Sequence, residues 1–354
     1  MVHQLNHYRL LGRSGLRVSP LSLGTMTFGV AQSWGTDDAE AERIFRRYAE
    51  RGGNFVDTAN FYSNGNSERV IAKLVQGERS RFVIATKYSL TMRPGDPNAS
   101  GNHRKNMIQS VEASLERLDS DYIDLLYLHV WDSRTPVEEI LRAFDDLVRT
   151  GKVLYVGVSD TPAWQASRMQ TMADLRGLSP LIALQIPYNL TERTVERDLI
   201  PMAKEMGMGV LPWSPLAGGV LSGKYEQKDL QRPASAEGLK FDTRKDINVM
   251  TGRLSERNLT IAATAKTVAQ ELGRTPAQVA LAWTLLNPGV TSTILGTRTL
   301  AQLEDNLGAL DIRFSEDQIA RLNVVSRIDL GFPHEFLNSG AMSMMFGGVN
   351  VEKH

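Results

Sequence analysis

Short apolar runs alternate with segments whose apolar residues recur every three or four positions along most of the chain. The runs are typical of buried strands and the periodic segments of amphipathic helices, so their alternation predicts a parallel sheet covered by helices. Eight runs suit a closed (β/α)8 barrel of the α/β class, formed by one domain over residues 1–354. The predicted strands are 20–24, 54–58, 82–87, 123–129, 153–159, 182–186, 209–214 and 291–296.

The segment before the first predicted strand has the pattern of a hairpin. Residues 8–11 and 16–18 are short alternating runs, and Gly12 to Gly15 form a turn between them. We expect this hairpin to close the bottom of the barrel.

Several predicted helices carry start signals in the sequence. Three polar residues stand three positions before a Glu or Gln, as in a capping box, and three prolines follow a threonine, as the first helical residue after an N-cap would. The pairs are Asp37 with Glu40, Thr135 with Glu138 and Thr275 with Gln278, and the prolines are Pro136, Pro162 and Pro276.

Three long segments interrupt the alternation. Residues 88–102 are rich in Pro, Gly, Asn and Ser, residues 215–250 follow the seventh strand, and residues 328–354 form a tail rich in Gly, Phe and Met. Long loops in compact domains are usually functional or disordered. We expect the first and third to wall a substrate pocket and the second to cover a cofactor.

The composition excludes several classes of protein. Forty basic residues balance forty acidic ones in 354 residues, so no overall charge favours a nucleic acid or an anionic membrane as partner. Cysteine is absent, which excludes thiolate catalysis and disulfides. The sequence has six histidines, and we expect no metal. Without a signal peptide or an apolar stretch of about 20 residues, the expected location is the cytoplasm.

Four residues with useful chemistry lie at or just beyond the C-terminal ends of predicted strands: Asp57, Tyr62, Lys87 and His129. In a parallel barrel these ends meet at one mouth, where active sites form. A carboxylate, a phenol, an ammonium and an imidazole would then share one pocket, a set suited to giving a proton to a carbonyl oxygen.

Tyr62 is the natural proton donor of this set. An unperturbed tyrosine has a pKa of about 10, and we expect a neighbouring Lys87 to lower it by about 2–3 units in a pocket shielded from water. Asp57 would hold Lys87, and His129, either neutral or protonated, would orient the substrate oxygen. Taken singly, each residue is as well explained by an ordinary structural role, so the prediction depends on the set.

None of the four can carry a hydride, so a cofactor must. Trp213, at the end of the seventh strand, offers a face for a nicotinamide, and the glycine-rich residues 217–224 allow close backbone approach, with Lys224 beside a pyrophosphate. After the eighth strand Arg298 suits a phosphate at a helix N-terminus and favours NADPH over NADH. Alternatively these residues form a flexible loop and a solvated helix face. Residues 24–29 do not match G-x-G-x-x-G and no P-loop occurs.

The sequence resembles the aldo-keto reductase superfamily over nearly its whole length. The matching segments occur in order, and within the superfamily NFYSNGNSE at 60–68 and PWSPL at 212–216 resemble bacterial and fungal members related to aryl-alcohol dehydrogenases. The ordered segments are LGTMTFG at 23–29, GNFVDTANFY at 53–62, DYIDLLYLH at 121–129 and GKVLYVGVS at 151–159.

The resemblance implies a (β/α)8 barrel and reversible, NADPH-dependent reduction of aldehydes or ketones. It assigns Asp57, Tyr62, Lys87 and His129 as catalytic residues, with Tyr62 the acid. Asp160 stands where many relatives have Asn. If its side chain contacts the carboxamide of the cofactor, the carboxylate lacks the donor that Asn would supply; alternatively, Asp160 caps the next helix. The implied NADP(H) residues are Thr25, Met26, Asp57, Ser159, Asp160, Gln185, Trp213, Ser214, Leu216, Gly218, Lys224, Gly296, Arg298, Gln302, Asp305 and Asn306.

Two other functions remain open from sequence. One is an NADPH-binding, redox-sensing regulatory subunit resembling potassium-channel beta subunits, disfavoured because we expect no segment for partner contact before the hairpin. The other is a phosphate-binding barrel isomerase. A small carbonyl or alcohol is the expected partner, and the apolar tail allows a homo-oligomer. The aromatic residues expected to line the pocket for a flat substrate are Trp34, Tyr88, Trp131 and, less directly, Phe332 or Phe336.

Overall fold

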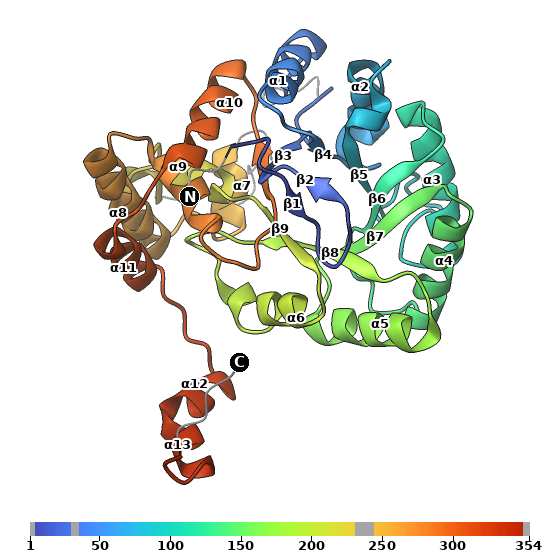
Figure 1. Cartoon of the computed structure of the whole chain (residues 1–354). Helices are drawn as coiled ribbons and strands as arrows, with labels where there is room; N and C mark the ends of the chain where they lie inside the picture. Colours follow the sequence, from blue (N-terminus) through green and yellow to red (C-terminus); the bar gives the residue numbers. More distant parts are fainter. Residues whose placement is uncertain (1–3, 30–34, 231–243, 350–354) are drawn as a thin grey trace.

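The computed structural model describes residues 4–29, 35–230 and 244–349. Eight parallel strands form one sheet in the order β10-β3-β4-β5-β6-β7-β8-β9, and helices surround it (Figure 1). The predicted (β/α)8 barrel is therefore confirmed. The strands are β3 (Leu21–Gly24), β4 (Phe55–Asp57), β5 (Val83–Tyr88), β6 (Ile123–Leu128), β7 (Val153–Ser159), β8 (Leu181–Pro187), β9 (Gly209–Trp213) and β10 (Thr293–Gly296).

The two ends of the sheet approach each other through the segment that leads into β10. Val210 of β9 forms a parallel bridge with Val290, and the amide of Thr291 donates to the carbonyl of Val210 over 2.8 Å. β10 then pairs in parallel with β3. The sheet therefore wraps into a nearly closed barrel whose strand ends meet at one mouth.

The predicted hairpin is present and closes the bottom of the barrel. Strands β1 (Arg9–Leu10) and β2 (Arg17–Val18) pair antiparallel and lie across the barrel end that faces the viewer in Figure 1. Leu11 and Val18 are buried in the cluster that fills the barrel interior. Gly12 is required at the turn, because its φ is +55° and a Cβ would lie 2.3 Å from the carbonyl oxygen of Ile182.

The barrel strands alternate between two environments, as successive strand residues must. On β5, Val83 and Ala85 belong to the interior cluster, whereas Ile84 packs in the larger cluster between the sheet and the helices. Lys87 continues the inward row, and Tyr88 continues the outward one. Asp57 and His129 likewise follow inward residues of β4 and β6. The strand period thus delivers the candidate residues to the inside of the mouth.

Eleven helices of seven residues or more are described along the chain. Thr275 forms a complete capping box with Gln278, with Pro276 first in the helix, as predicted. Asp37 accepts from the amide of Glu40. The helices are α1 (Asp38–Glu50), α2 (Asn66–Leu74), α3 (Arg104–Leu118), α4 (Val137–Arg149), α5 (Ala163–Arg176), α6 (Leu199–Glu205), α7 (Arg244–Met250), α8 (Glu256–Leu272), α9 (Pro276–Thr284), α10 (Leu300–Leu307) and α11 (Glu316–Val325).

Two predicted helix starts are wrong by one residue. Pro136 and Pro162 have extended ψ angles of 136° and 140°, so each precedes its helix instead of beginning it. Thr135 is no cap, because its hydroxyl donates to the carboxylate of Asp132, 2.7 Å away.

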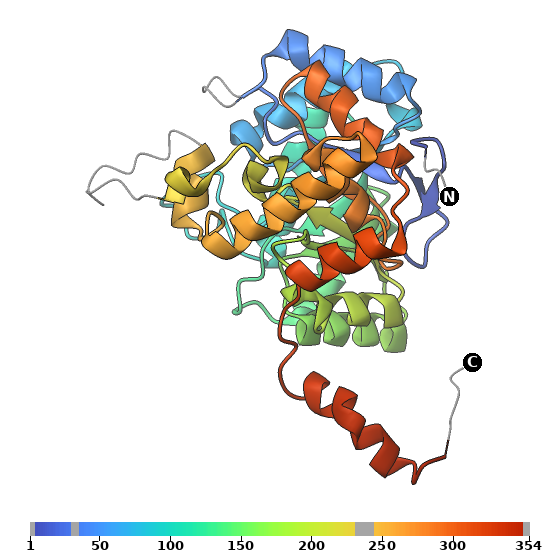
Figure 2. The same cartoon turned by 90° about the vertical axis from the view of Figure 1, so that its left-hand side faces the viewer.

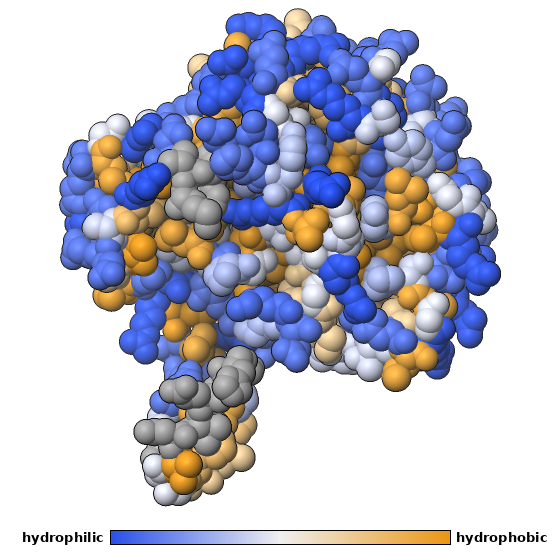
Figure 3. Space-filling view, viewed as in Figure 1, coloured by the Kyte–Doolittle hydropathy of each residue, from blue (hydrophilic) through white to orange (hydrophobic). Residues whose placement is uncertain are grey.

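The C-terminal tail does not wall the mouth, and that expectation is wrong. Its short helices α12 (His334–Phe336) and α13 (Met342–Met345) extend away from the barrel (Figures 1 and 2). Phe332 and Phe336 are 86% and 55% exposed, and apolar patches are visible on the tail in Figure 3. Neither phenylalanine therefore lines a substrate pocket. Across the described residues, no helix has the length and apolarity needed to span a membrane.

Glu68 links two outer helices to the strand that carries Lys87. Its fully buried carboxylate accepts from Arg117 of α3 and from Thr86 of β5, each over 2.6 Å. A buried carboxylate that loses its cation is strongly destabilising. We predict that Arg117→Met lowers the free energy of unfolding in urea by about 3–5 kcal/mol.

The exposed pair Arg13–Asp174 provides the control. Arg13→Met should cost less than about 1 kcal/mol, because exposed ion pairs contribute little. Equal losses in the two variants would show that Glu68 does not depend on its buried partner.

Candidate active site

Backbone strain is concentrated at the barrel mouth. Among the described residues, seven of the eight non-glycine residues with positive φ lie in loops that follow barrel strands. Each such conformation costs roughly 1–3 kcal/mol and persists where the surrounding structure enforces it, often at functional sites. This distribution marks the mouth, and not the bottom, as the functional end. The seven are Ser63, Asn64, Ser89, Ser133, Asp160, Ser214 and Ala217.

The ammonium of Lys87 is the centre of the site. Its side chain is fully buried, and Nζ donates to Asp57 Oδ2 over 2.7 Å, to the carbonyl of Thr58 over 2.7 Å and to the hydroxyl of Tyr62 over 3.2 Å. An ammonium has three donors, so these three oxygens saturate it. The structure thus brings together three of the four predicted catalytic residues, and it adds the Thr58 carbonyl, which no side-chain pattern could reveal.

Asp57 is held on both of its oxygens. Oδ1 accepts from Gln185 Nε2 over 2.8 Å while Oδ2 faces Lys87. Gln185, expected at the cofactor, therefore also fixes the carboxylate. Tyr127 lies below them in the interior cluster, and burial raises its pKa well above the ordinary value, helped by the charge of Asp57. Sequence reasoning missed Tyr127, although its inward position two residues before His129 was a usable signal.

The expected net lowering of the pKa of Tyr62 is wrong. Burial raises this pKa above its ordinary value, the charge of Lys87 opposes the rise, and Asp57 and Asp160 add to it. Exclusion of water strengthens the attraction between Lys87 and a phenolate, but it also makes the charged phenolate itself less favourable. In addition, Asp57 offsets the charge of the ammonium from 2.7 Å away. Burial lowers the pKa of Lys87, but the interactions with Asp57 and Tyr62 outweigh this effect, so its pKa is raised overall. The resting site therefore holds a neutral phenol beside a charged lysine.

His129 faces Tyr62 across the mouth. The two ring centroids are 5.9 Å apart, with an interplanar angle of 80°. Burial, with the nearby charge of Lys87, lowers the pKa of His129 to about 3. The open question of its protonation is answered in favour of the neutral ring. Its Nδ1 is buried without a hydrogen-bond partner among the described residues.

Asp160 and Trp213 form the opposite rim. Trp213 Nε1 donates to Asp160 Oδ1 over 3.1 Å, and the guanidinium of Arg253 lies 5.8 Å from the centroid of Trp213. Asp160 has a φ of +42° and is exposed at the mouth. It does not cap α5 through its side chain, since no side-chain hydrogen bond is made at that helix start.

The loop after β9 fits an anionic group. Gly218 and Gly219 have positive φ, and a Cβ on Gly219 would lie 2.9 Å from Lys224 Nζ. The ammonium therefore lies close to bare backbone, and a phosphate can approach both. Asn248 of α7 donates to the carbonyl of Gly218 over 3.0 Å and ties the insertion to this loop.

The start of α10 is arranged differently from the expected phosphate site. The amide of Arg298 donates to the Gln302 side chain over 2.9 Å, and the amide of Leu300 donates to the carboxylate of Glu40 over 2.6 Å. These amides are therefore engaged by the protein itself. The Arg298 side chain, on an exposed residue, remains the predicted phosphate contact.

Two further predicted adenosine contacts also have structural partners. Asp305 accepts from Thr275 over 3.0 Å and from Gln278 over 3.1 Å, and Asn306 is 5% exposed. Their contact with a cofactor stays a prediction. Of the other predicted cofactor residues, Thr25 and Ser159 are buried, whereas Met26, Ser214, Leu216, Lys224 and Gly296 are partly or fully exposed.

The expected role of Tyr88 in the substrate pocket is wrong. Its side chain is fully buried outside the barrel, where the hydroxyl donates to the carbonyl of Asn102 over 3.1 Å and the ring packs edge-on against Phe144 of α4. The strand period turns Tyr88 outward because Lys87 points inward. Trp131 is half-buried after β6, and Trp34 lies outside the described residues.

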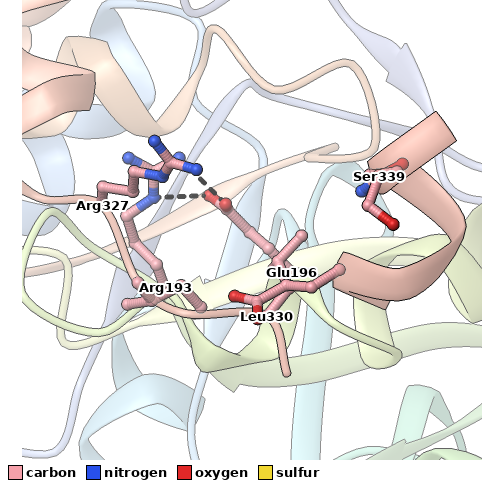
Figure 4. A pocket seen from close by; sticks show the side chains of 8 residues that line it. Arg193, Glu196, Arg327, Leu330 and Ser339 are labelled. Atoms are coloured by element: carbon pink, nitrogen blue, oxygen red, sulfur yellow. Dashed lines mark hydrogen bonds and ion pairs between the residues drawn. The ribbon is translucent and has the colours of Figure 1, made fainter. Parts of the chain in front are cut away.

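A pocket of about 450 Å³ lies beside the tail (Figure 4). Two of its four charged lining residues, Arg193 and Glu196, form an ion pair over 2.9 Å. None of the predicted catalytic residues lines it, so it is not the candidate active site.

Fold and site together define a (β/α)8 barrel with buried ionisable side chains gathered at its mouth. The chain matches the model of the Aldo/keto reductase family over residues 20–327. It belongs to this family and is an oxidoreductase.

The relatives agree with this assignment. The chain is 36% identical to a norsolorinic acid reductase of Aspergillus flavus, covering 94% of this chain and 84% of that protein. It is 36% identical to an NADP(+) aryl-alcohol dehydrogenase of Phanerodontia chrysosporium, covering 95% and 89%. An uncharacterised oxidoreductase of Bacillus subtilis is 38% identical, with 89% and 94% covered. The predicted resemblance is confirmed.

The low pKa of His129 predicts an acid-dependent loss of stability. Between the unfolded pKa of about 6.5 and the folded value of about 3, the unfolded chain binds a proton that the folded chain does not. Stability therefore falls as the pH falls through this window. We predict that between about pH 6.5 and 5 the wild type loses about 2 kcal/mol more than His129→Asn, measured by urea unfolding.

The exposed His7 supplies a control. His7→Asn should lose as much unfolding free energy over this pH range as the wild type. The same pH dependence in His129→Asn as in the wild type would contradict a neutral, buried His129.

Proposed function

We propose that this chain is an NADPH-dependent reductase of aldehydes or ketones, with Tyr62 as the general acid. The observation that carries the proposal is the hydrogen bond from Lys87 Nζ to the hydroxyl of Tyr62. Because the phenol oxygen accepts this bond, its own proton is directed elsewhere. A carbonyl oxygen at the mouth is the group that would take it.

The raised pKa of Tyr62 supports the reductive direction. The proton stays on the phenol until the carbonyl oxygen gains negative charge. Lys87 then stabilises the phenolate left behind, since its ammonium is already in contact with that oxygen. Asp57 keeps Lys87 charged and in place, so it acts through the lysine.

The neutral His129 has a separate role. The protonated nitrogen of a neutral imidazole can donate to the carbonyl oxygen without adding a charge. Because the rings of His129 and Tyr62 are in T-shaped contact, both side chains could donate to the same oxygen. Two donors at one oxygen orient the carbonyl and polarise it.

A nicotinamide cofactor would supply the hydride when bound. Trp213 would hold the nicotinamide end of this cofactor. The backbone of Gly218 and Gly219, together with Lys224, would bind its pyrophosphate, and Arg298 would bind a phosphate at the adenosine end. Since the amides at the start of α10 are engaged, the guanidinium and not the helix end would choose NADPH over NADH. The NADP(+) named for the Phanerodontia relative supports this choice.

An aromatic or otherwise flat carbonyl is the proposed substrate. Trp131 and Trp213 are partly exposed aromatic residues. Both contact Asp160, since the amide of Trp131 donates to its carbonyl over 3.4 Å and Trp213 Nε1 to its carboxylate over 3.1 Å. The name of the aryl-alcohol dehydrogenase relative points to the same class. A screen of NADPH consumption over aromatic and aliphatic aldehydes tests this part.

Tyr62→Phe tests the mechanism. Removing the hydroxyl should lower kcat for an aromatic aldehyde by about 10²–10⁴-fold, the range for a lost general acid. The Kd for NADPH, measured by fluorescence titration, should change by less than about twofold, because the ring remains.

Tyr122→Phe is a matched control, since Tyr122 immediately precedes β6 at the bottom of the barrel. It should leave kcat unchanged. Full turnover in Tyr62→Phe would refute the assignment of the acid.

A further inference from the structure

The mouth contains a second carboxylate that the mechanism above does not use. Asp160, directly after β7, is exposed beside the site. Its amide donates to the carbonyl of Gln185 over 3.3 Å, and the side chain of Gln185 holds Asp57. Trp213 contacts it directly, with Nε1 donating to Oδ1 over 3.1 Å.

The hydride donor must lie close to these same groups. A hydride can reach only the carbon whose oxygen Tyr62 protonates, and reacting atoms stand about 3–3.5 Å apart. The nicotinamide ring of the proposed cofactor would therefore be held by residues of the mouth near Tyr62 and Trp213. Because Asp160 is hydrogen-bonded to Trp213, its carboxylate would lie close to a ring held there.

The two forms of the ring differ in charge. The oxidised nicotinamide is a cation and the reduced one is neutral, so a nearby carboxylate stabilises the oxidised form selectively. The other charged groups facing this space are the ammonium of Lys87, offset by Asp57 at 2.7 Å, and Arg253 over the ring of Trp213. Although the residue is exposed in part, burial of its carboxylate raises the pKa of Asp160, and the hydrogen bond from Trp213 and the charge of Lys87 oppose that rise.

We propose that Asp160 sets the preference of the site between the two redox forms, favouring NADP⁺ over NADPH relative to an amide at this position. The inference rests on the proposed function, because it requires a nicotinamide at the mouth. By linkage, the equilibrium on the protein shifts by the same factor toward bound alcohol with NADP⁺, that is, toward reduction of the carbonyl. Asp160 is thus a specificity-determining residue for the redox state of the cofactor.

Asp160→Asn is a suitable variant, because Asn tolerates the positive φ of +42° at this position. Affinities for NADP⁺ and NADPH are measured separately by calorimetry at low salt and about pH 8, where an aspartate of somewhat raised pKa is ionised. The ratio Kd(NADP⁺)/Kd(NADPH) should rise about threefold to tenfold in Asp160→Asn, as expected for losing one partly screened charge contact. Using the ratio cancels any new hydrogen bond that Asn makes to both forms.

Asp174→Asn removes a distant, exposed carboxylate on α5 and should leave the ratio unchanged. In the wild type the ratio should rise as the pH falls and Asp160 loses its charge, whereas Asp160→Asn should show no such rise. If both dinucleotides bind and the ratio is the same in wild type and Asp160→Asn, the inference is overturned while the proposed function stands. If the wild type binds neither dinucleotide, the proposed function is rejected and the inference with it.

Discussion

A fully buried ammonium and the three oxygens around it are the constraint on which the site depends. Removing an ammonium from water costs several kcal/mol unless partners replace the lost hydration. Lys87 meets this requirement with a carboxylate, a carbonyl and a phenol, all within 3.2 Å. Because Asp57, Thr58 and Tyr62 belong to one strand and the loop after it, the register between β4 and β5 fixes the whole arrangement.

The same contacts decide which group holds which proton. Burial raises the pKa of Tyr62, Lys87 opposes the rise and Asp57 adds to it, so Tyr62 remains a neutral phenol. The neutral His129 adds no charge to the mouth. The site is therefore poised to give a proton only when negative charge develops on a substrate oxygen. Asp160 lies outside this compensated group, and its carboxylate accepts a hydrogen bond from Trp213.

Much of this could be predicted from sequence, because it follows from the period of strands. Apolar runs gave the eight strands, and residues at their C-terminal ends gave Asp57, Lys87 and His129. The same period places Tyr88, the residue after Lys87, on the outer face of the barrel. The prediction that it lines the pocket relied on its aromatic character instead and was wrong. The tail could not be placed, since composition alone does not say where Phe332 and Phe336 pack.

Other features depend on distances that no pattern contains. The pKa of Tyr62 depends on the balance between burial, the charge of Lys87 and the charge of Asp57, so the sign of its shift was beyond sequence reasoning. The use of the Leu300 amide by Glu40 joins residues 260 positions apart. The extended backbone at Pro136 depends on how the preceding loop uses Asp132 and Thr135.

Neutron diffraction from deuterated crystals would test the central claim most directly, because it locates the protons. The account predicts three deuterons on Nζ of Lys87, directed at Asp57, Thr58 and the oxygen of Tyr62, with the phenolic deuteron pointing into the mouth. A phenolic deuteron directed at a neutral Lys87 amine, or a Tyr62 without one near neutral pH, would contradict it.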